Sequence, residues 1–156
     1  AQSGTDFGTD DVLDFFSNSL DCDAHPYFDQ LRGVRVSAHF FVRRTGECVQ
    51  FASCDARAWH AGASDFFGRT RCNDFSIGIE IEGTDDQPFT PEQYVATASL
   101  VRAICASYPI GAIAGHSDIA PGRKTDPGPC FDWAHLRGLG GLGAALFPYQ
   151  PGAAPA

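Results

Sequence analysis

The clearest pattern along the chain is a strict alternation of apolar and polar residues over residues 75–83. A period of two predicts a β-strand, with isoleucines and a phenylalanine on one face and small or acidic residues on the other. Ser76 and Gly78 are small and leave space above the second face, which Glu80 and Glu82 border. The alternation places both glutamates on one side. It is consistent with an acid–base cleft and equally with a plain solvent-exposed edge.

A second alternating segment, residues 34–42, is followed by a polar turn and a return strand at residues 48–52. This order predicts a β-hairpin. His39 shares one face of the first strand with Phe41, so we expect a packed, hydrogen-bonded core histidine there rather than a ligand. The apolar residues 110–114 predict a further buried strand.

Helical periodicity appears in two places. Thr9 and the acidic residues after it cap a short predicted helix, whose apolar stripe is Val12, Leu13, Phe16 and Leu20. Thr90 begins a capping box with proline at the first helical position, which predicts a helix to about Tyr108. The expected buried stripe of this second helix is Tyr94, Ala98, Val101, Cys105 and Tyr108.

The C-terminal part of the chain is predicted to hold one more short helix, over residues 131–136. Residues 139–156 are rich in Gly, Ala and Pro, and we expect them to form a loosely attached tail. The length of 156 residues suits one compact domain. The sequence therefore predicts a single domain over residues 1–138, followed by the tail.

Composition narrows the class of partner. The apolar fraction of 44% and charged fraction of 19% are ordinary for a globular protein. A net charge of −8 argues against nucleic acid and against adhesion to an anionic surface. No apolar stretch approaches membrane-spanning length, and the first residues carry no signal-peptide pattern. None of the six cysteines forms a C-x-x-C spacing, and we expect reduced, mostly buried thiols.

Candidate chemistry is concentrated in residues 115–129, directly after the predicted strand at 110–114. Three prolines and three glycines predict a rigid loop there rather than a helix. His116 and Asp126 offer an imidazole and a carboxylate, which suit a Zn²⁺ ion. Lys124, close to such a metal, can stabilise a developing oxyanion. The alternative is a surface loop in which Asp126 caps a turn and Lys124 is solvated.

The long irregular segment at residues 54–73 is a second candidate region, because long loops in compact domains tend to be functional. Trp59 can stack on a sugar or peptide group, or it can cover the edge of the core. Arg69 and Arg71 place positive charge on an acidic protein, where they bind a substrate carboxylate or pair with nearby acids. We take Trp59 and Arg71 as the candidate substrate-binding residues.

Three stretches together resemble the zinc-dependent N-acetylmuramoyl-L-alanine amidase family: residues 57–62, 71–80 and 115–129. With residues 24–28 and 35–39 added, the chain is similar to the AmpD type, which are bacterial cytosolic amidases that act on 1,6-anhydro-muropeptides. The resemblance covers most of residues 4–137. It implies an α/β fold with a central mixed β-sheet flanked by helices, as in amidase and peptidoglycan-recognition domains.

The resemblance also assigns roles to residues. His116 and Asp126 match two of the family's three protein zinc ligands. Glu80 matches the glutamate that acts as general base, a choice that alternation alone leaves open between Glu80 and Glu82. Lys124 matches the lysine that stabilises the tetrahedral intermediate.

The implied activity is hydrolysis of the amide bond between (1,6-anhydro-)N-acetylmuramic acid and L-alanine in peptidoglycan fragments, for cell-wall recycling. The implied cofactor is Zn²⁺. The expected partner is a small muropeptide, with no nucleic acid or membrane partner. We expect a monomeric, cytoplasmic protein.

One feature departs from the family pattern. The third zinc ligand of the family is a histidine at the end of the first strand, and it aligns just before Ala1. The sequence therefore predicts an N-terminally incomplete amidase domain, or alternatively a zinc-free module that binds muropeptide without catalysis. A hydrolase with a cysteine nucleophile is a third alternative, but no cysteine has an obvious activating histidine beside it.

Overall fold

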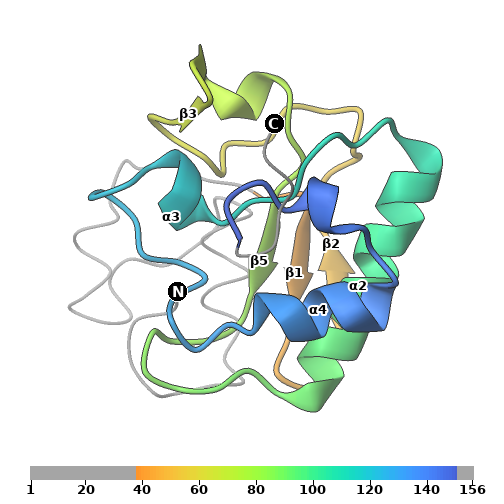
Figure 1. Cartoon of the computed structure of the whole chain (residues 1–156). Coiled ribbons are helices and arrows are strands. Elements are labelled where there is room, and N and C mark those ends of the chain that lie inside the picture. Colours follow the sequence, from red (N-terminus) through yellow and green to blue (C-terminus); the bar gives the residue numbers. More distant parts are fainter. Residues whose placement is uncertain (1–37, 151–156) are drawn as a thin grey trace, which may run out of the picture.

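The computed structural model describes residues 38–150, and its centre is a three-stranded sheet with the order β2-β1-β5 (Figure 1). Strand β1 spans Phe40–Val42, β2 spans Cys48–Gln50 and β5 spans Ile79–Ile81. β1 pairs with β2 in antiparallel and with β5 in parallel orientation, so the sheet is mixed, as expected. The antiparallel pair confirms the predicted hairpin.

β5 is shorter than the alternation predicts, because only Ile79–Ile81 forms a ladder with β1. Residues before it leave the strand through a 3₁₀ helix, η2, at Cys72–Asp74. Gly78 still contacts β1, since its carbonyl accepts from the backbone N–H groups of His39 (3.0 Å) and Phe40 (3.2 Å). Backbone hydrogen bonding to the β1 segment therefore extends one residue beyond the ladder, to Gly78.

A second, two-stranded sheet precedes η2 in the chain and lies above the upper end of the central sheet in Figure 1. It consists of β3 (Asp65–Phe66) and β4 (Arg69–Thr70) in antiparallel pairing. The turn between them has positive φ at Phe67 (48°) and at Gly68 (91°), the combination required by a tight two-residue turn.

Helix α2 (Pro91–Ser107) begins at the predicted capping box. Thr90 Oγ1 accepts from the N–H of Gln93 at 3.2 Å, and Gln93 Oε1 accepts from the N–H of Thr90 at 3.0 Å. The predicted buried stripe is wrong at its C-terminal end, because Ile104 is buried while Cys105 and Tyr108 are only half-buried. The buried face consists of Gln93, Tyr94, Thr97, Ala98, Val101 and Ile104.

The C-terminal helix α4 (Trp133–Gly140) begins later and runs longer than predicted, because Asp132 Oδ1 caps it by accepting from the N–H of His135 at 2.9 Å. α4 packs against α2 and lies in front of the sheet in Figure 1. The 3₁₀ helix η3 (Ala144–Leu146) follows. Phe147 is 1% exposed within the main core cluster, so the expected loose attachment of the tail is wrong up to Gln150.

Residues 110–114 do not form the predicted strand. Within residues 38–150, their one backbone hydrogen bond to a distant segment runs from the N–H of Ile113 to the carbonyl of Leu146 (2.6 Å), which belongs to η3. No strand within residues 38–150 lies beside them to form a ladder. The following loop also differs from prediction, since His116–Ile119 forms a short helix, α3. This helix ends before Pro121, the first proline of the stretch, and Asp118 Oδ2 accepts from the N–H of Gly115 (2.8 Å).

Several predictions fall on residues outside the described range: the helix after Thr9, residues 24–28 and the strand residues before Ala38. Within the described range, five cysteines carry free thiols. Only Cys72 of these is buried and Cys48 is exposed, so the expected burial of the thiols is wrong for most of them. No helix in residues 38–150 combines the length and apolar character needed to cross a membrane.

Candidate active site

A cavity of about 870 Å³ lies beside β5 and reaches from the core to the loop that carries α3. One wall is formed by Ile79–Ile81 of β5, and the facing wall by residues 112–116. The polar side chains that line it come from separate parts of the sequence and include His60, Ser76, Glu80, His116 and Asp126. The cavity thus brings together three of the residues that the sequence singled out, namely Glu80, His116 and Asp126.

His116 and Asp126 meet at one end of this cavity, as the sequence predicts. His116 Nδ1 lies 3.2 Å from Asp126 Oδ2. Two backbone contacts fix this approach. The N–H of Ser117 donates to the carbonyl of Asp126 at 2.9 Å, and the N–H of Ala120 donates to the carbonyl of His116, also at 2.9 Å. Helix α3 and the loop after it are therefore folded back on each other.

The second ring nitrogen of His116 faces a backbone carbonyl. Its Nε2 lies 3.0 Å from the carbonyl oxygen of Ala61. Both ring nitrogens of His116 thus face oxygen acceptors, but a neutral imidazole carries one proton. When Nε2 donates to Ala61, Nδ1 presents its lone pair to the Asp126 carboxylate. A cation between Nδ1 and Oδ2 satisfies both groups, and so does a second proton on the ring.

The pKa values of the Glu80 and Asp126 carboxyl groups are shifted in opposite directions. Burial alone would raise the pKa of Asp126, but the hydrogen bond with His116 contributes to lowering the pKa of this carboxylate to about 2. Burial raises the pKa of Glu80, and the nearby negative charge of Asp126 raises it further. Asp126 is therefore suited to remain an anion, and Glu80 to exchange a proton.

The structure separates Glu80 from Glu82, which the alternation could not. Glu80 lines the cavity with His116 and Asp126. Glu82 is 3% exposed, and its Oε2 accepts from the backbone N–H of Arg44 at 2.8 Å. Glu82 thereby fixes the turn after β1, a structural contact away from the cavity wall.

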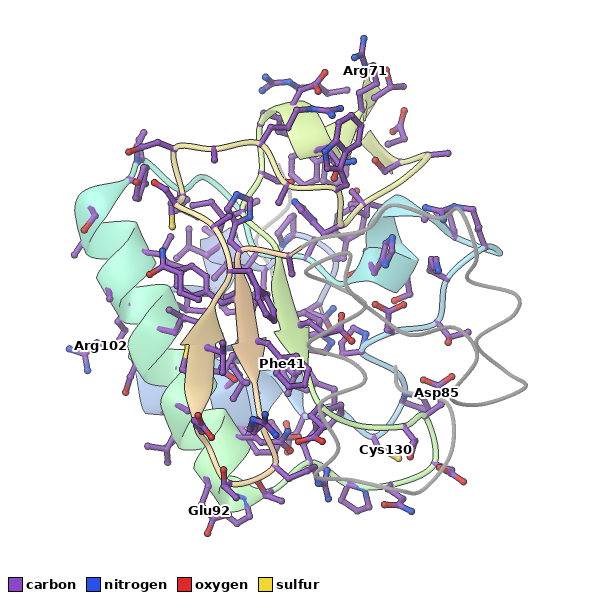
Figure 2. The ribbon with its side chains drawn as sticks, turned by 180° about the vertical axis from the view of Figure 1, so that it is seen from behind. Phe41, Arg71, Asp85, Glu92, Arg102 and Cys130 are labelled. Carbon is purple, nitrogen blue, oxygen red and sulfur yellow. The ribbon has the colours of Figure 1, made fainter. Side chains whose placement is uncertain are left out.

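Lys124 lies on the same loop as Asp126, and its backbone N–H donates to the carbonyl of Ala120 at 3.0 Å. Its side chain is exposed and does not line the cavity. The neighbouring Thr125 holds the loop, because its Oγ1 donates to Asp85 Oδ2 at 2.7 Å. Figure 2 shows Asp85 close to Cys130, whose thiol approaches the carbonyl oxygen of Asp85 at 3.4 Å.

Trp59 and Arg71 lie at the rim rather than in the cavity. Trp59 is 52% exposed, so it does not cover the core, and the Arg57 guanidinium stacks on its ring at 3.7 Å from the centroid. Asp74 connects Arg71 to Trp59 through Arg57. Its carboxylate contacts Arg57 Nε at 2.8 Å and Arg71 Nε at 3.3 Å. The Arg71 side chain projects from one end of the molecule in Figure 2.

His60 lines the cavity although the sequence did not single out its side chain. Its ring covers Gly78 so closely that a Cβ there would lie 2.4 Å from His60 Cγ, which explains why this position is a glycine. Burial, and the charges of His39 and His116, lower the pKa of His60 to about 4. The sequence feature that could have indicated His60 is its position directly after Trp59, in the long loop that faces the small residues of the alternating segment.

His39 is a fully buried core histidine, as predicted, since its Nε2 contacts the carbonyl of Ala56 at 2.8 Å.

The spacing of the His116 and Asp126 donor atoms can be compared with the geometry of a zinc site. Tetrahedral zinc with ligands about 2.0–2.1 Å away places neighbouring ligand atoms about 3.3 Å apart. The 3.2 Å between His116 Nδ1 and Asp126 Oδ2 fits two corners of such a site. Residues 38–150 contain no cluster of three or more His, Cys, Asp or Glu side chains suited to a metal. The distance between the two atoms is therefore compatible with two of the ligands of a zinc site.

Comparison with known proteins places the chain in a family. The profile of the N-acetylmuramoyl-L-alanine amidase family matches residues 10–129, well over half of the 156 residues. The chain therefore belongs to the N-acetylmuramoyl-L-alanine amidase family.

Its relatives include the 1,6-anhydro-N-acetylmuramyl-L-alanine amidases AmpD of Salmonella typhimurium (strain SL1344) and Escherichia coli (strain K12). Each is 52% identical over 136 residues, which cover 86% of this chain and 73% or 74% of the relative. The AmpD-type resemblance found in the sequence is thereby confirmed.

Solved structures agree with this assignment. A crystal structure of a selenomethionine AmpD derivative superposes with a TM-score of 0.84 at 51% identity, covering 86% of this chain and 76% of that one. The Escherichia coli amidase AmiD, in complex with anhydro-N-acetylmuramic acid-L-Ala-D-gamma-Glu-L-Lys, gives a TM-score of 0.65 at 36% identity, covering 76% of this chain and 52% of that one. The expected fold, a mixed sheet flanked by helices, is confirmed.

Proposed function

We propose that this chain is a zinc-dependent amidase that hydrolyses the bond between 1,6-anhydro-N-acetylmuramic acid and L-alanine in peptidoglycan fragments. The observation that carries the proposal is the convergence of Glu80, His116 and Asp126 in one cavity of a protein from this amidase family. The names of the AmpD relatives and the muropeptide bound to AmiD supply the substrate class.

His116 Nδ1 and Asp126 Oδ2 are the atoms that would hold the zinc ion. When bound, zinc supplies a water that is acidic enough to attack an amide near neutral pH, and a Lewis acid for the carbonyl. In the tautomer in which His116 Nε2 donates to the Ala61 carbonyl, Nδ1 carries the lone pair that a metal requires.

Glu80 is the proposed general base. Burial raises its pKa, so the carboxylate is a better proton acceptor than an ordinary exposed glutamate. It takes a proton from the attacking water and delivers this proton to the leaving nitrogen of L-alanine. Lys124 is proposed to approach from the loop and to stabilise the oxyanion of the tetrahedral intermediate.

The third zinc ligand is expected from outside residues 38–150. The family resemblance implies a histidine at the end of a β-strand. The second edge of β5 pairs with no strand in the described range, and the cavity beside it separates β5 from residues 112–114. A strand that filled this space would end near His116 and Asp126.

Substrate recognition is assigned to the rim. The exposed face of Trp59 suits a sugar or peptide group, and Arg71 suits a carboxylate of the stem peptide. The partner is a small muropeptide. We propose a monomeric cytoplasmic protein with no nucleic acid or membrane partner, in keeping with the net charge of −8.

The test is to incubate the purified protein with anhydro-muropeptide and to follow release of the free stem peptide by mass spectrometry, with and without a zinc chelator. Release that stops with chelator and returns with zinc supports the proposal. Muropeptide binding without release, at saturating zinc, supports the second candidate, a binding module, which the two-ligand donor set favours.

Metal analysis is the matching control. Because the family resemblance assigns only two zinc ligands to this chain, we expect the full chain of 156 residues to hold zinc weakly, so that dialysis against chelator-free buffer removes it. One tightly held zinc per chain would contradict this expectation. It would mean that another histidine completes the site.

A further inference from the structure

We propose that the backbone carbonyl of Ala61 orients His116 in the metal site, and that Arg123 and Asn73 are positioning residues that hold this carbonyl in place. The inference rests on the proposed zinc site, but it concerns residues to which no role has been assigned. Ala61 is completely buried, and it lies 55 residues from His116 in the sequence. The contact therefore depends on how the segment that contains Ala61 is held.

Asn73 holds the backbone from one side. Its Oδ1 accepts from the N–H of Ala61 at 2.8 Å and from the N–H of His60 at 3.0 Å. Asn73 is 7% exposed and belongs to η2, so its position is fixed by the 3₁₀ turn. Because one amide oxygen accepts from two successive N–H groups, it fixes the plane of the peptides that lead to the Ala61 carbonyl.

Arg123 holds the carbonyl from the other side. Its Nη2 donates to the carbonyl of Ala61 at 2.7 Å and to the carbonyl of Ala63, also at 2.7 Å. Gly62 lies between them with φ of 60°, and a Cβ there would be 3.1 Å from Arg123 Nη2. The left-handed backbone at Gly62 thus turns two carbonyls toward one guanidinium nitrogen.

The carbonyl of Ala61 serves His116 and Arg123 together. His116 Nε2 lies 3.0 Å and Arg123 Nη2 lies 2.7 Å from this oxygen. Arg123 Nη2 is also 3.5 Å from His116 Nε2; a guanidinium only donates, so this longer contact needs the Nε2 lone pair, whereas the shorter contact with Ala61 needs the Nε2 proton. This arrangement fixes the ring of His116 with Nδ1 toward Asp126. Partners that fix a ligating histidine in this way commonly change metal affinity by about 10–100-fold when they are removed.

A purely electrostatic role for Arg123 makes the opposite prediction. A guanidinium near a metal site repels a cation, so removing it would tighten zinc binding. A positioning role predicts weaker binding after removal. The sign of the change therefore distinguishes the two roles.

The experiment uses the full chain and three substitutions. Arg123→Met removes the donors at similar length, and Arg123→Lys restores a donor nitrogen. Arg102→Ala is the matched control, because Arg102 lies exposed on α2, remote from Arg71 and the rim in Figure 2. Zinc dissociation constants are measured by competition with a chromogenic chelator.

We expect about tenfold weaker zinc binding in Arg123→Met, partial recovery in Arg123→Lys and no change in Arg102→Ala. Unchanged or tighter binding in Arg123→Met overturns the inference. Asn73→Leu is a second variant that should act in the same direction if it folds.

A metal-free readout separates this inference from the proposed function. Long-range ¹H–¹⁵N NMR spectra identify which nitrogen of His116 carries the proton and how fast this proton exchanges with water. We expect a proton on Nε2 that exchanges at least about tenfold faster in Arg123→Met than in the wild type. A protein without zinc affinity but with this NMR difference refutes the zinc site and retains the Ala61 contact. Equal exchange in both proteins refutes the contact.

Discussion

The two sides of β5 are held together by different interactions. Toward the loops at residues 57–64 and 71–78, polar contacts are dense: Asn73 binds two successive backbone N–H groups, and Ser76 Oγ donates to the carbonyl of Cys72 at 2.6 Å. Toward residues 110–114, β5 has no strand pairing within the described range, and these residues line the cavity of about 870 Å³ together with parts of the two loops. His116 lies where the two sides meet.

The two sides differ in what they contribute to the candidate site. The polar side fixes the orientation of His116 and the cavity-lining position of Glu80 by hydrogen bonds within residues 38–150. The open side lacks both a strand that pairs with β5 and a third candidate ligand for the proposed metal among the same residues. The polar side therefore holds the candidate catalytic side chains in place by hydrogen bonds. The open side leaves one edge of β5 without a paired strand among the described residues.

The largest expected effect distinguishes the two glutamates near β5. In a form of the protein that hydrolyses muropeptide, Glu80→Gln removes the general base and should lower kcat by about 10²–10⁴. Glu82→Gln keeps an acceptor for the N–H of Arg44, so kcat should stay within about threefold. Steady-state kinetics check both. The opposite result, with Glu82 essential and Glu80 dispensable, would overturn the assignment.

Truncation of a side chain in the packed core and of one beside the cavity should differ in cost. Phe147 is 1% exposed in the core cluster, and Phe147→Ala should lower the free energy of unfolding by about 3–5 kcal/mol. Ile79 is half-buried and lines the cavity, so Ile79→Ala should cost only about 1 kcal/mol. Urea denaturation measures both. Equal costs would show that Ile79 is packed as tightly as the core.

Lys124 tests whether the exposed loop takes part in turnover. In the same active form, Lys124→Ala should lower kcat by about 10²–10³, the usual cost of losing one oxyanion-stabilising donor. Lys124→Met should be nearly as damaging because charge matters more than bulk. KM and zinc content should change little. A rise in KM alone would make Lys124 a substrate anchor, and loss of zinc would make its role structural.

His60 gives a pH test of the polar side. Its folded pKa of about 4 lies below the ordinary value of 6.5, so between these values the unfolded state binds more protons. Stability should therefore fall as pH decreases from about 6.5 to about 4, by up to about 3 kcal/mol. His60→Gln should lack this component. Urea denaturation of both proteins across this pH range compares the slopes, and parallel slopes would contradict the depressed pKa.

Local sequence patterns were sufficient where a single segment decides the structure. The capping box at Thr90 set the start of α2, and alternation on either side of the turn after Val42 set the hairpin. The sequence also determined the family and the pair His116 and Asp126, because long motifs carried the resemblance. These features depend on neighbours in the chain, which the sequence displays directly.

Only tertiary contacts decided the rest. Residues 110–114 are apolar enough for a strand, but a strand needs a ladder partner, and none lies beside them in the described part. Glu80 and Glu82 share one side of the alternation, yet one lines the cavity and the other binds the N–H of Arg44. The link from Ala61 to His116 spans 55 residues, and a distant backbone carbonyl leaves no mark on composition or periodicity. Such contacts form only when distant segments meet in the folded chain. The sequence by itself therefore determined which candidate residues are present, and the fold determined which of them lie together in the cavity.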